Sequence, residues 1–176
     1  MECHTTLPPG VRIRPLEPHH DSRGSLVEAF RDSWDPSVQG AQVNLMWSRA
    51  GTLRGSHVHG KHADYFVLAA GRSTIGIKDV RKRSPAYGTT ALVELTSDTP
   101  SAMIVPPGVL HGLYVPVESI LLTVESHVYD PEEEVRCLWN DPDLGIPWPF
   151  SSARVSASDA VGHSLAEVTE MVARRE

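Results

Sequence analysis

Short runs of valine, leucine, isoleucine and threonine recur along most of the chain, and prolines and glycines separate them. The chain contains 14 prolines and 13 glycines, and it has no internal repeat or low-complexity tract. Many short apolar segments at nearly even spacing, divided by turn-forming residues, are typical of an all-β sandwich or barrel. The sequence therefore predicts an all-β fold. We expect its strands in the ranges 25–30, 42–48, 65–69, 73–78, 91–95, 102–105, 112–115 and 120–128.

The last part of the chain carries the clearest helical pattern. Ser164 is followed three residues later by Glu167, which is the spacing of a capping box at a helix N-terminus. Leu165, Val168 and Val172 then recur at helical spacing. We therefore predict a short C-terminal helix.

Length and composition favour a single domain. The 176 residues are 40% hydrophobic, which is enough for one core, and we divide them into an N-terminal extension (1–20), a barrel (21–150) and a C-terminal loop and helix (151–176). The formal charge of −6 disfavours a nucleic-acid partner. No run approaches the roughly 18 apolar residues of a membrane helix, and no secretory signal pattern begins the chain. We therefore expect no membrane partner. Two cysteines offer no disulfide framework, so we expect a cytoplasmic protein.

Three histidines and one aspartate have spacings that suit a metal ion. His57 and His59 are two residues apart, so their side chains share one face of a strand. Asp64 can return on the next strand, and His111 follows the turn at 106–108. Neutral imidazoles together with a carboxylate suit Fe, Mn, Ni, Zn or Cu. The alternative is that these side chains line a pocket that holds no metal.

The same positions resemble the two sequence motifs of the cupin superfamily. The first motif is matched by Gly51, His57, His59, Asp64 and Gly71, and the second by Pro106, Gly108 and His111. The first match has aspartate where the motif has glutamate. In the second, Pro100 and Val115 stand where the motif has a glycine and an asparagine.

A longer series of motifs occurs in order between positions 21 and 159. It includes Asp21-Ser22-Arg23-Gly24, Gln42-Val43-Asn44, Leu53-Arg54-Gly55-x-His57, Pro106-x-Gly108-x-x-His111-Gly112, Trp139-Asn140-Asp141-Pro142, Gly145-Ile146-x-Trp148-Pro149 and Ser156-Ala157-Ser158-Asp159. This series resembles the dTDP-4-dehydrorhamnose 3,5-epimerase family, a metal-independent branch of the cupins. The resemblance implies a jelly-roll barrel, that is, a double-stranded β-helix, which assembles as a homodimer.

The resemblance also implies an isomerase that requires no cofactor and acts on a dTDP-type 4-keto-6-deoxy sugar. A ketone acidifies the hydrogens on its neighbouring carbons, so a general base can remove one and leave an enolate. The family's base falls on His57, and the aspartate that orients it falls on Asp159. The family's substrate-binding positions, one of which reaches across the dimer at Arg23, fall on Arg23, Glu28, Gln42, Asn44, Arg54 and His111.

Two positions depart from the family pattern. The family's lysine falls on Asp64, and its catalytic tyrosine falls on Thr123. Glu125 and His127 share the face of Thr123 if that strand is regular, so they are candidates for new proton chemistry. We therefore place Thr123 and His127 in the substrate site and expect altered regiochemistry, such as epimerisation at C3 alone. A metal at Asp64 would supply the positive charge that the lysine no longer provides.

Three functions remain open from the sequence. The first is a nucleotide-sugar epimerase or isomerase, and the second is a metal-dependent cupin enzyme that uses His57, His59, Asp64 and His111 on another carbonyl or natural-product substrate. The third is a non-catalytic relative that binds a nucleotide sugar or a partner protein. The run RGSHVH at 54–59 also resembles sugar-nucleotide 3,4-ketoisomerases, which shuttle a proton with paired histidines.

Overall fold

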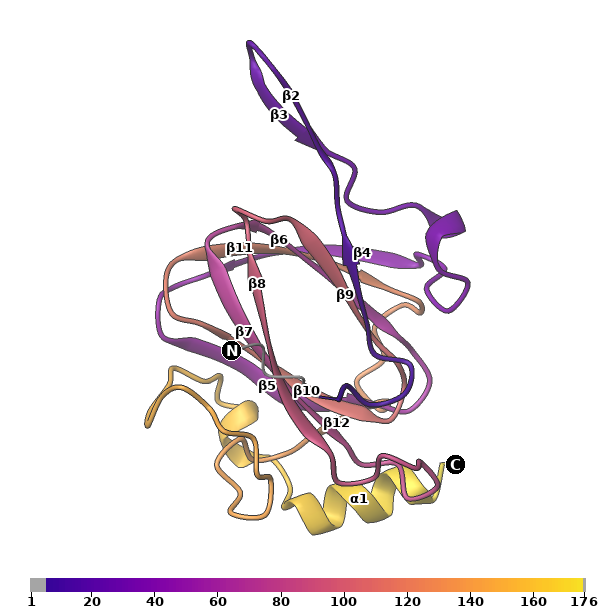
Figure 1. Ribbon diagram of the computed structural model, residues 1–176. Coiled ribbons are helices and arrows are strands. Elements are labelled where there is room, and N and C mark those ends of the chain that lie inside the picture. The colour runs from indigo at the N-terminus through magenta and orange to yellow at the C-terminus, as the bar shows by residue number, and fades with distance from the viewer. Residues whose placement is uncertain (1–5, 176) are drawn as a thin grey trace.

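A computed structural model describes residues 6–175 and shows two facing antiparallel sheets that form a barrel (Figure 1). The first sheet, in spatial order, contains β1 (Arg12–Pro15), β9 (Ser101–Val105), β6 (Asp64–Ala70), β11 (Ser119–Glu125) and β4 (Gln42–Ser48). The second contains β12 (Glu134–Arg136), β5 (Thr52–His59), β10 (Val109–Val115), β7 (Arg72–Asp79) and β8 (Thr90–Thr96). The predicted all-β jelly roll is confirmed.

Alternation along the strands separates the inside of the barrel from the outside. In β6, Phe66 and Leu68 belong to the apolar cluster between the sheets, whereas Tyr65 and Val67 belong to a second cluster on the outer face of the first sheet. Successive side chains of a strand point to opposite faces, so both faces of this strand are buried by different neighbours. The barrel therefore has an inner core and a covered outer face.

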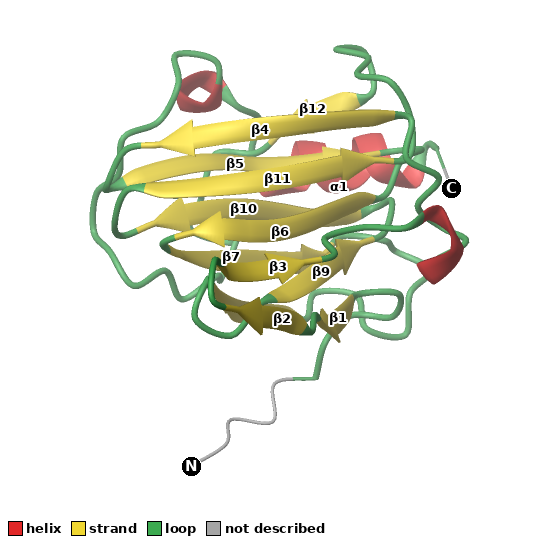
Figure 2. Ribbon diagram, turned by 90° about the horizontal axis from the view of Figure 1, so that it is seen from above, coloured by secondary structure: helices red, strands yellow, loops and turns green. Residues whose placement is uncertain are grey.

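The C-terminal segment covers the outer face of the second sheet. Helix α1 (Leu165–Ala173) contributes Val168 and Val172 to a third apolar cluster, which also contains Val58 of β5 and Val135 of β12. Ser164 accepts a hydrogen bond from the Glu167 N–H, and the Glu167 side chain accepts one from Ser164, so the predicted capping box and helix are confirmed. In the view from above, α1 lies behind the strands (Figure 2).

A hairpin of β2 (Pro18–Asp21) and β3 (Gly24–Val27) projects away from the barrel (Figure 1). The prediction placed a strand at 25–30, but pairing ends at Val27 and the chain continues to a 3-10 turn, η1 (Asp32–Trp34). The predicted strand at 42–48 coincides with β4. The predicted strand at 120–128 ends at Glu125. The prediction missed β1, β2 and β12, which contain three or four residues each and carry little apolar pattern. No expected range covers β5 (Thr52–His59) either, although the metal hypothesis placed His57 and His59 on a strand.

No helix within residues 6–175 is long and apolar enough to span a membrane.

Buried Asp79 holds the turn that follows β7. Its Oδ1 accepts hydrogen bonds from the backbone N–H and Nε of Arg81, and its Oδ2 accepts from Arg81 Nη2 at 2.7 Å and Ser84 Oγ at 2.6 Å. Arg81 also donates to the carbonyl of Pro9 at 2.9 Å, which ties the N-terminal segment to this turn. Burial acts to raise the pKa of Asp79, but these hydrogen bonds prevail and hold the pKa below its usual range.

We predict that Asp79→Asn lowers the free energy of unfolding by about 3 kcal/mol at pH 7, because it leaves a partly buried guanidinium without its counter-charge. A lowered pKa in the folded state stabilises the protein above the unfolded pKa of about 4, and this stabilisation is lost as the pH falls through the folded pKa. The gap between wild type and variant should therefore narrow below about pH 4. Urea denaturation across pH measures this, with exposed Asp98→Asn as the matched control. Equal losses in the two variants would contradict the assignment.

Candidate active site

Inward-facing polar side chains line an open cavity of about 410 Å³ at one end of the barrel. On β5, Val58 belongs to the apolar cluster beneath α1, outside the barrel. Its neighbours His57 and His59 therefore point inward. The same alternation points Asp64 of β6 inward with Phe66, as the sequence-based metal hypothesis requires. The lining also includes Gln42, Asn44, Arg54, His62, His111, Thr123, Glu125, Tyr129, Glu134, Arg136, Ser156, Ser158 and Asp159.

His57 is hydrogen-bonded to Asp159. The distance from His57 Nε2 to Asp159 Oδ1 is 2.6 Å, although 102 residues separate the two in the chain. Asp159 begins a 3-10 turn, η2 (Asp159–Val161), and its backbone N–H donates to Ser156 Oγ at 3.0 Å. Burial acts to raise the pKa of Asp159, but the hydrogen bond and charge of His57, together with hydrogen bonds from Ser156 and Gly55, hold the pKa below its usual value. An ionised carboxylate can only accept, so Nε2 carries the proton and Nδ1 is left as the basic nitrogen.

Gly55 permits the close approach of β5 to β10 beside this pair. Its φ is +118°, a conformation that side-chain-bearing residues rarely adopt. A Cβ at this position would lie 2.9 Å from both Gly112 Cα and the His111 carbonyl oxygen. The glycine of the arginine-glycine-x-histidine motif therefore sets the position of His57.

A cluster of three histidines surrounds Asp64. Asp64 Oδ2 lies 3.4 Å from His59 Nε2 and 3.3 Å from His111 Nε2, and Asp64 Oδ1 lies 3.5 Å from His62 Nε2. Burial lowers the pKa of His59 to about 3 and also lowers the pKa of His111. Burial would lower the pKa of His62 too, but Asp64 raises it above its usual value. His62 is buried in the cavity wall and does not face outward.

The facing sheet contributes a network of amide and carboxylate groups. Asn44 Nδ2 donates to Glu125 Oε1 at 2.7 Å and lies 3.3 Å from Thr123 Oγ1. Gln42 Nε2 donates to Asn44 Oδ1 at 3.1 Å. Glu125 Oε2 is buried without a hydrogen-bond partner among the described residues, and burial raises the pKa of this carboxyl. Because β11 remains regular to Glu125, the predicted common face of Thr123 and Glu125 is observed.

Two arginines reach the cavity. Arg54 Nε donates to Ser48 Oγ at 2.9 Å, which holds the guanidinium at the wall. Arg136 lies opposite His57 in the pairing of β12 with β5 and forms an ion pair with Glu134. Its Nε lies 3.8 Å from Asp159 Oδ1. No sequence pattern points to Arg136, because β12 is a three-residue strand inside a charged stretch.

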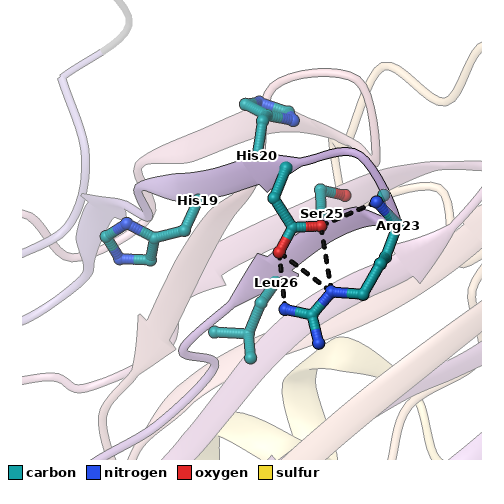
Figure 3. A pocket seen from close by; sticks show the side chains of 7 residues that line it. His19, His20, Arg23, Ser25 and Leu26 are labelled. Atoms are coloured by element: carbon teal, nitrogen blue, oxygen red, sulfur yellow. Dashed lines mark hydrogen bonds and ion pairs between the residues drawn. The ribbon is translucent and has the colours of Figure 1, made fainter.

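Three predicted substrate-binding residues lie outside this cavity. Arg23 is on the projecting hairpin, where it forms an ion pair with Asp21 beside a separate shallow hollow (Figure 3). Glu28 forms an ion pair with Arg31. His127 is exposed because β11 ends at Glu125, and its ring lies against Ser126 Oγ.

The profile of dTDP-4-dehydrorhamnose 3,5-epimerases matches residues 4–167. The chain belongs to this epimerase family. The dTDP-4-dehydrorhamnose 3,5-epimerase of Salmonella typhimurium is 30% identical over 170 residues, which cover 91% of this chain and 93% of that protein. The predicted family membership and isomerase class are confirmed.

Solved structures of other epimerases share the fold. The rmlC epimerase of Mycobacterium tuberculosis superposes with a TM-score of 0.85 at 28% identity, over 93% of this chain and 88% of that one. ChmJ, a 3'-monoepimerase from Streptomyces bikiniensis in complex with dTDP-quinovose, gives a TM-score of 0.84 at 28% identity over the same shares. Epimerases of this family need no cofactor.

Proposed function

We propose that this epimerase inverts a carbon next to the ketone of a dTDP-linked 4-keto-6-deoxy sugar. The observation that carries the proposal is the 2.6 Å hydrogen bond between His57 and Asp159 inside the barrel cavity. A relative with the same fold binds dTDP-quinovose, a nucleotide-linked deoxysugar. The cavity offers amide, carboxylate and guanidinium groups to such a substrate.

His57 acts as the general base in this proposal. Its Nδ1 takes the proton from the carbon beside the ketone, and the electron pair of the broken C–H bond moves onto the ketone oxygen as an enolate. Asp159 stabilises the imidazolium that results and keeps the proton on Nε2 before the reaction. Arg54 and Arg136 provide the positive charge that an enolate requires in a site without the family's lysine.

Glu125 is the proposed acid that returns a proton to the opposite face of the sugar. It stands on β11 of the first sheet, whereas His57 stands on β5 of the second, so the two groups approach the cavity from opposite sides. Its Oε2 has no hydrogen-bond partner within residues 6–175. Thr123, at the position of the family's tyrosine, is far too weak an acid for this role. A single acid at a new position favours reaction at one carbon, C3.

We also propose a homodimer in which the hairpin of one chain reaches the site of another. Within a single chain Arg23 and Glu28 lie away from the cavity, although the family places them in the nucleotide site. Large apolar side chains are exposed on the hairpin and on the outer face of β4, namely Leu26, Val43, Leu45 and Trp47. The three residues on β4 share one face of that strand, and exposed apolar side chains grouped in this way are typical of an interface.

His57→Ala should reduce turnover of dTDP-4-keto-6-deoxyglucose at least about 100-fold, because no base remains, and Asp159→Asn should reduce it by a similar factor through the wrong imidazole tautomer. Deuterium incorporation from heavy water, followed by NMR, measures abstraction directly. His163→Ala, outside the cavity, should retain wild-type exchange. Absence of deuterium at both carbons beside the ketone in the wild type would contradict the proposed function and favour a non-catalytic binder.

Glu125→Gln should keep hydrogen exchange at C3 but lose inversion by at least about tenfold, because the base is intact and the opposite-face acid is missing. NMR of the product distinguishes exchange with retention from inversion. The exposed Glu94→Gln variant on β8 is the matched control. Full inversion in Glu125→Gln would remove this residue from the mechanism.

The chain should have twice its mass of 19.3 kDa in sedimentation equilibrium. The double variant Leu45→Glu and Trp47→Glu should sediment as a monomer, since charge on this face opposes burial. Tyr87→Glu changes an exposed aromatic residue between β7 and β8 of the second sheet and should remain dimeric. A wild-type monomer at micromolar concentration would exclude the proposed dimer.

A further inference from the structure

Four side chains beside the proposed base converge on one point of the cavity. They are His59, His62, Asp64 and His111, and all are nearly fully buried, with exposed fractions of 7%, 4%, 4% and 4%. One ligand atom each from His59, His62 and Asp64 lies within 4.8 Å of the others. We propose that this cluster is a binding site for one divalent transition-metal ion.

The separations fit ligands of one ion. Ligands about 2.0–2.1 Å from a tetrahedral metal lie about 3.3 Å from one another. Asp64 Oδ2 lies 3.4 Å from His59 Nε2 and 3.3 Å from His111 Nε2. The third imidazole, His62, is 3.5 Å from Asp64 Oδ1. The two distances from Oδ2 match an edge of a tetrahedral site, and the contact of His62 with Oδ1 places a third imidazole beside the same carboxylate.

Two buried polar atoms of the cluster, Asp64 Oδ2 and His59 Nδ1, have no hydrogen-bond partner among the described residues. Two imidazole nitrogens nevertheless lie close to Asp64 Oδ2. His111 Nδ1 lies 3.1 Å from the Val109 carbonyl oxygen and donates to it. A neutral ring donates through one nitrogen, so Nε2 presents its lone pair to the Asp64 carboxylate. A cation between these two groups turns their repulsion into coordination.

The bond to the Val109 carbonyl also has the form of an outer-shell contact. Metal-bound histidines commonly donate their second ring N–H to a carbonyl or carboxylate, which fixes the ring orientation. Three imidazoles and one carboxylate suit Zn²⁺, Co²⁺, Ni²⁺, Fe²⁺ or Mn²⁺ rather than Mg²⁺ or Ca²⁺, which prefer oxygen ligands.

The proposed ligand set differs from the one predicted from sequence. That set contained His57 and left out His62. In the structure His57 Nε2 is committed to Asp159, and its Nδ1 lies 3.7 Å from Glu134 Oε2. His62 takes the place of His57 beside Asp64.

An ion in this cluster would lie beside the base, since the rings of His57 and His59 are 6.4 Å apart. If the proposed function holds, the ion would add positive charge near the enolate where the family has a lysine. Metal binding itself does not depend on that function, and it is tested without substrate.

Tag-free full-length protein is treated with chelator, desalted and titrated with CoCl₂ at neutral pH. We expect visible absorption of low-coordinate cobalt that saturates at one equivalent per chain, and ZnCl₂ should displace it. Elemental analysis after desalting should give one zinc per chain. A wild-type protein that shows neither cobalt absorption nor stoichiometric zinc would overturn the proposal.

Substitution of each proposed ligand tests the ligand set. Cobalt binding should weaken at least about tenfold in His59→Ala, in His62→Ala and in the near-isosteric Asp64→Asn. His57→Ala should keep one equivalent, as should His20→Ala on the exposed hairpin, and circular dichroism verifies folding of each variant. Loss of cobalt in His57→Ala, or wild-type affinity in His62→Ala, would overturn the ligand set. Deuterium exchange that persists in the metal-free wild type would separate metal binding from the epimerase activity.

Discussion

Alternation of side chains across antiparallel strands places the polar groups that the strands contribute to the cavity. In β5, β6, β10 and β11, alternate residues fill the space between the sheets. The other residues pack outward, against the segment after β3 on the first sheet and against the C-terminal helix on the second. Polar residues on the inner set must lie at the open end of the barrel, because the rest of the interior is filled by apolar side chains. A shift of one residue in any of these strands would exchange inner and outer sets. The site therefore depends on strand register before it depends on any single functional residue.

The hydrogen bond between His57 and Asp159 joins two parts of the fold that are distant in sequence. One part is β5, which lies between β12 and β10, and the other is the loop between the barrel and α1. Apolar packing of α1 and of the 144–148 segment against the second sheet keeps that loop in place. Gly55 allows β5 to approach β10 closely beside the histidine. Packing on the outside of the barrel thus orients a proton-transfer pair on the inside.

Local pattern accounts for much of this arrangement, and non-local pairing accounts for the rest. The two-residue spacing of His57 and His59 predicts their common face, and the capping box predicts α1. The pairing with Asp159 was available through family resemblance, since no local signal links residues 102 positions apart. His62 and Arg136 were missed because a loop residue and a three-residue strand have no periodicity from which to infer direction. His127 was expected in the site, but the strand ends two residues before it.

The cavity at one end of the barrel contains the His57–Asp159 pair, the buried carboxyl of Glu125 and the cluster of histidines around Asp64. The central claim is that Asp159 holds the proton of His57 on Nε2 and leaves Nδ1 as the base. Long-range ¹H–¹⁵N NMR of histidine-labelled protein at neutral pH measures this directly. The account predicts that His57 is the Nε2–H tautomer in the wild type and loses this preference in Asp159→Asn. A His57 ring that carries its proton on Nδ1 in the wild type, or a tautomer that Asp159→Asn leaves unchanged, would contradict it.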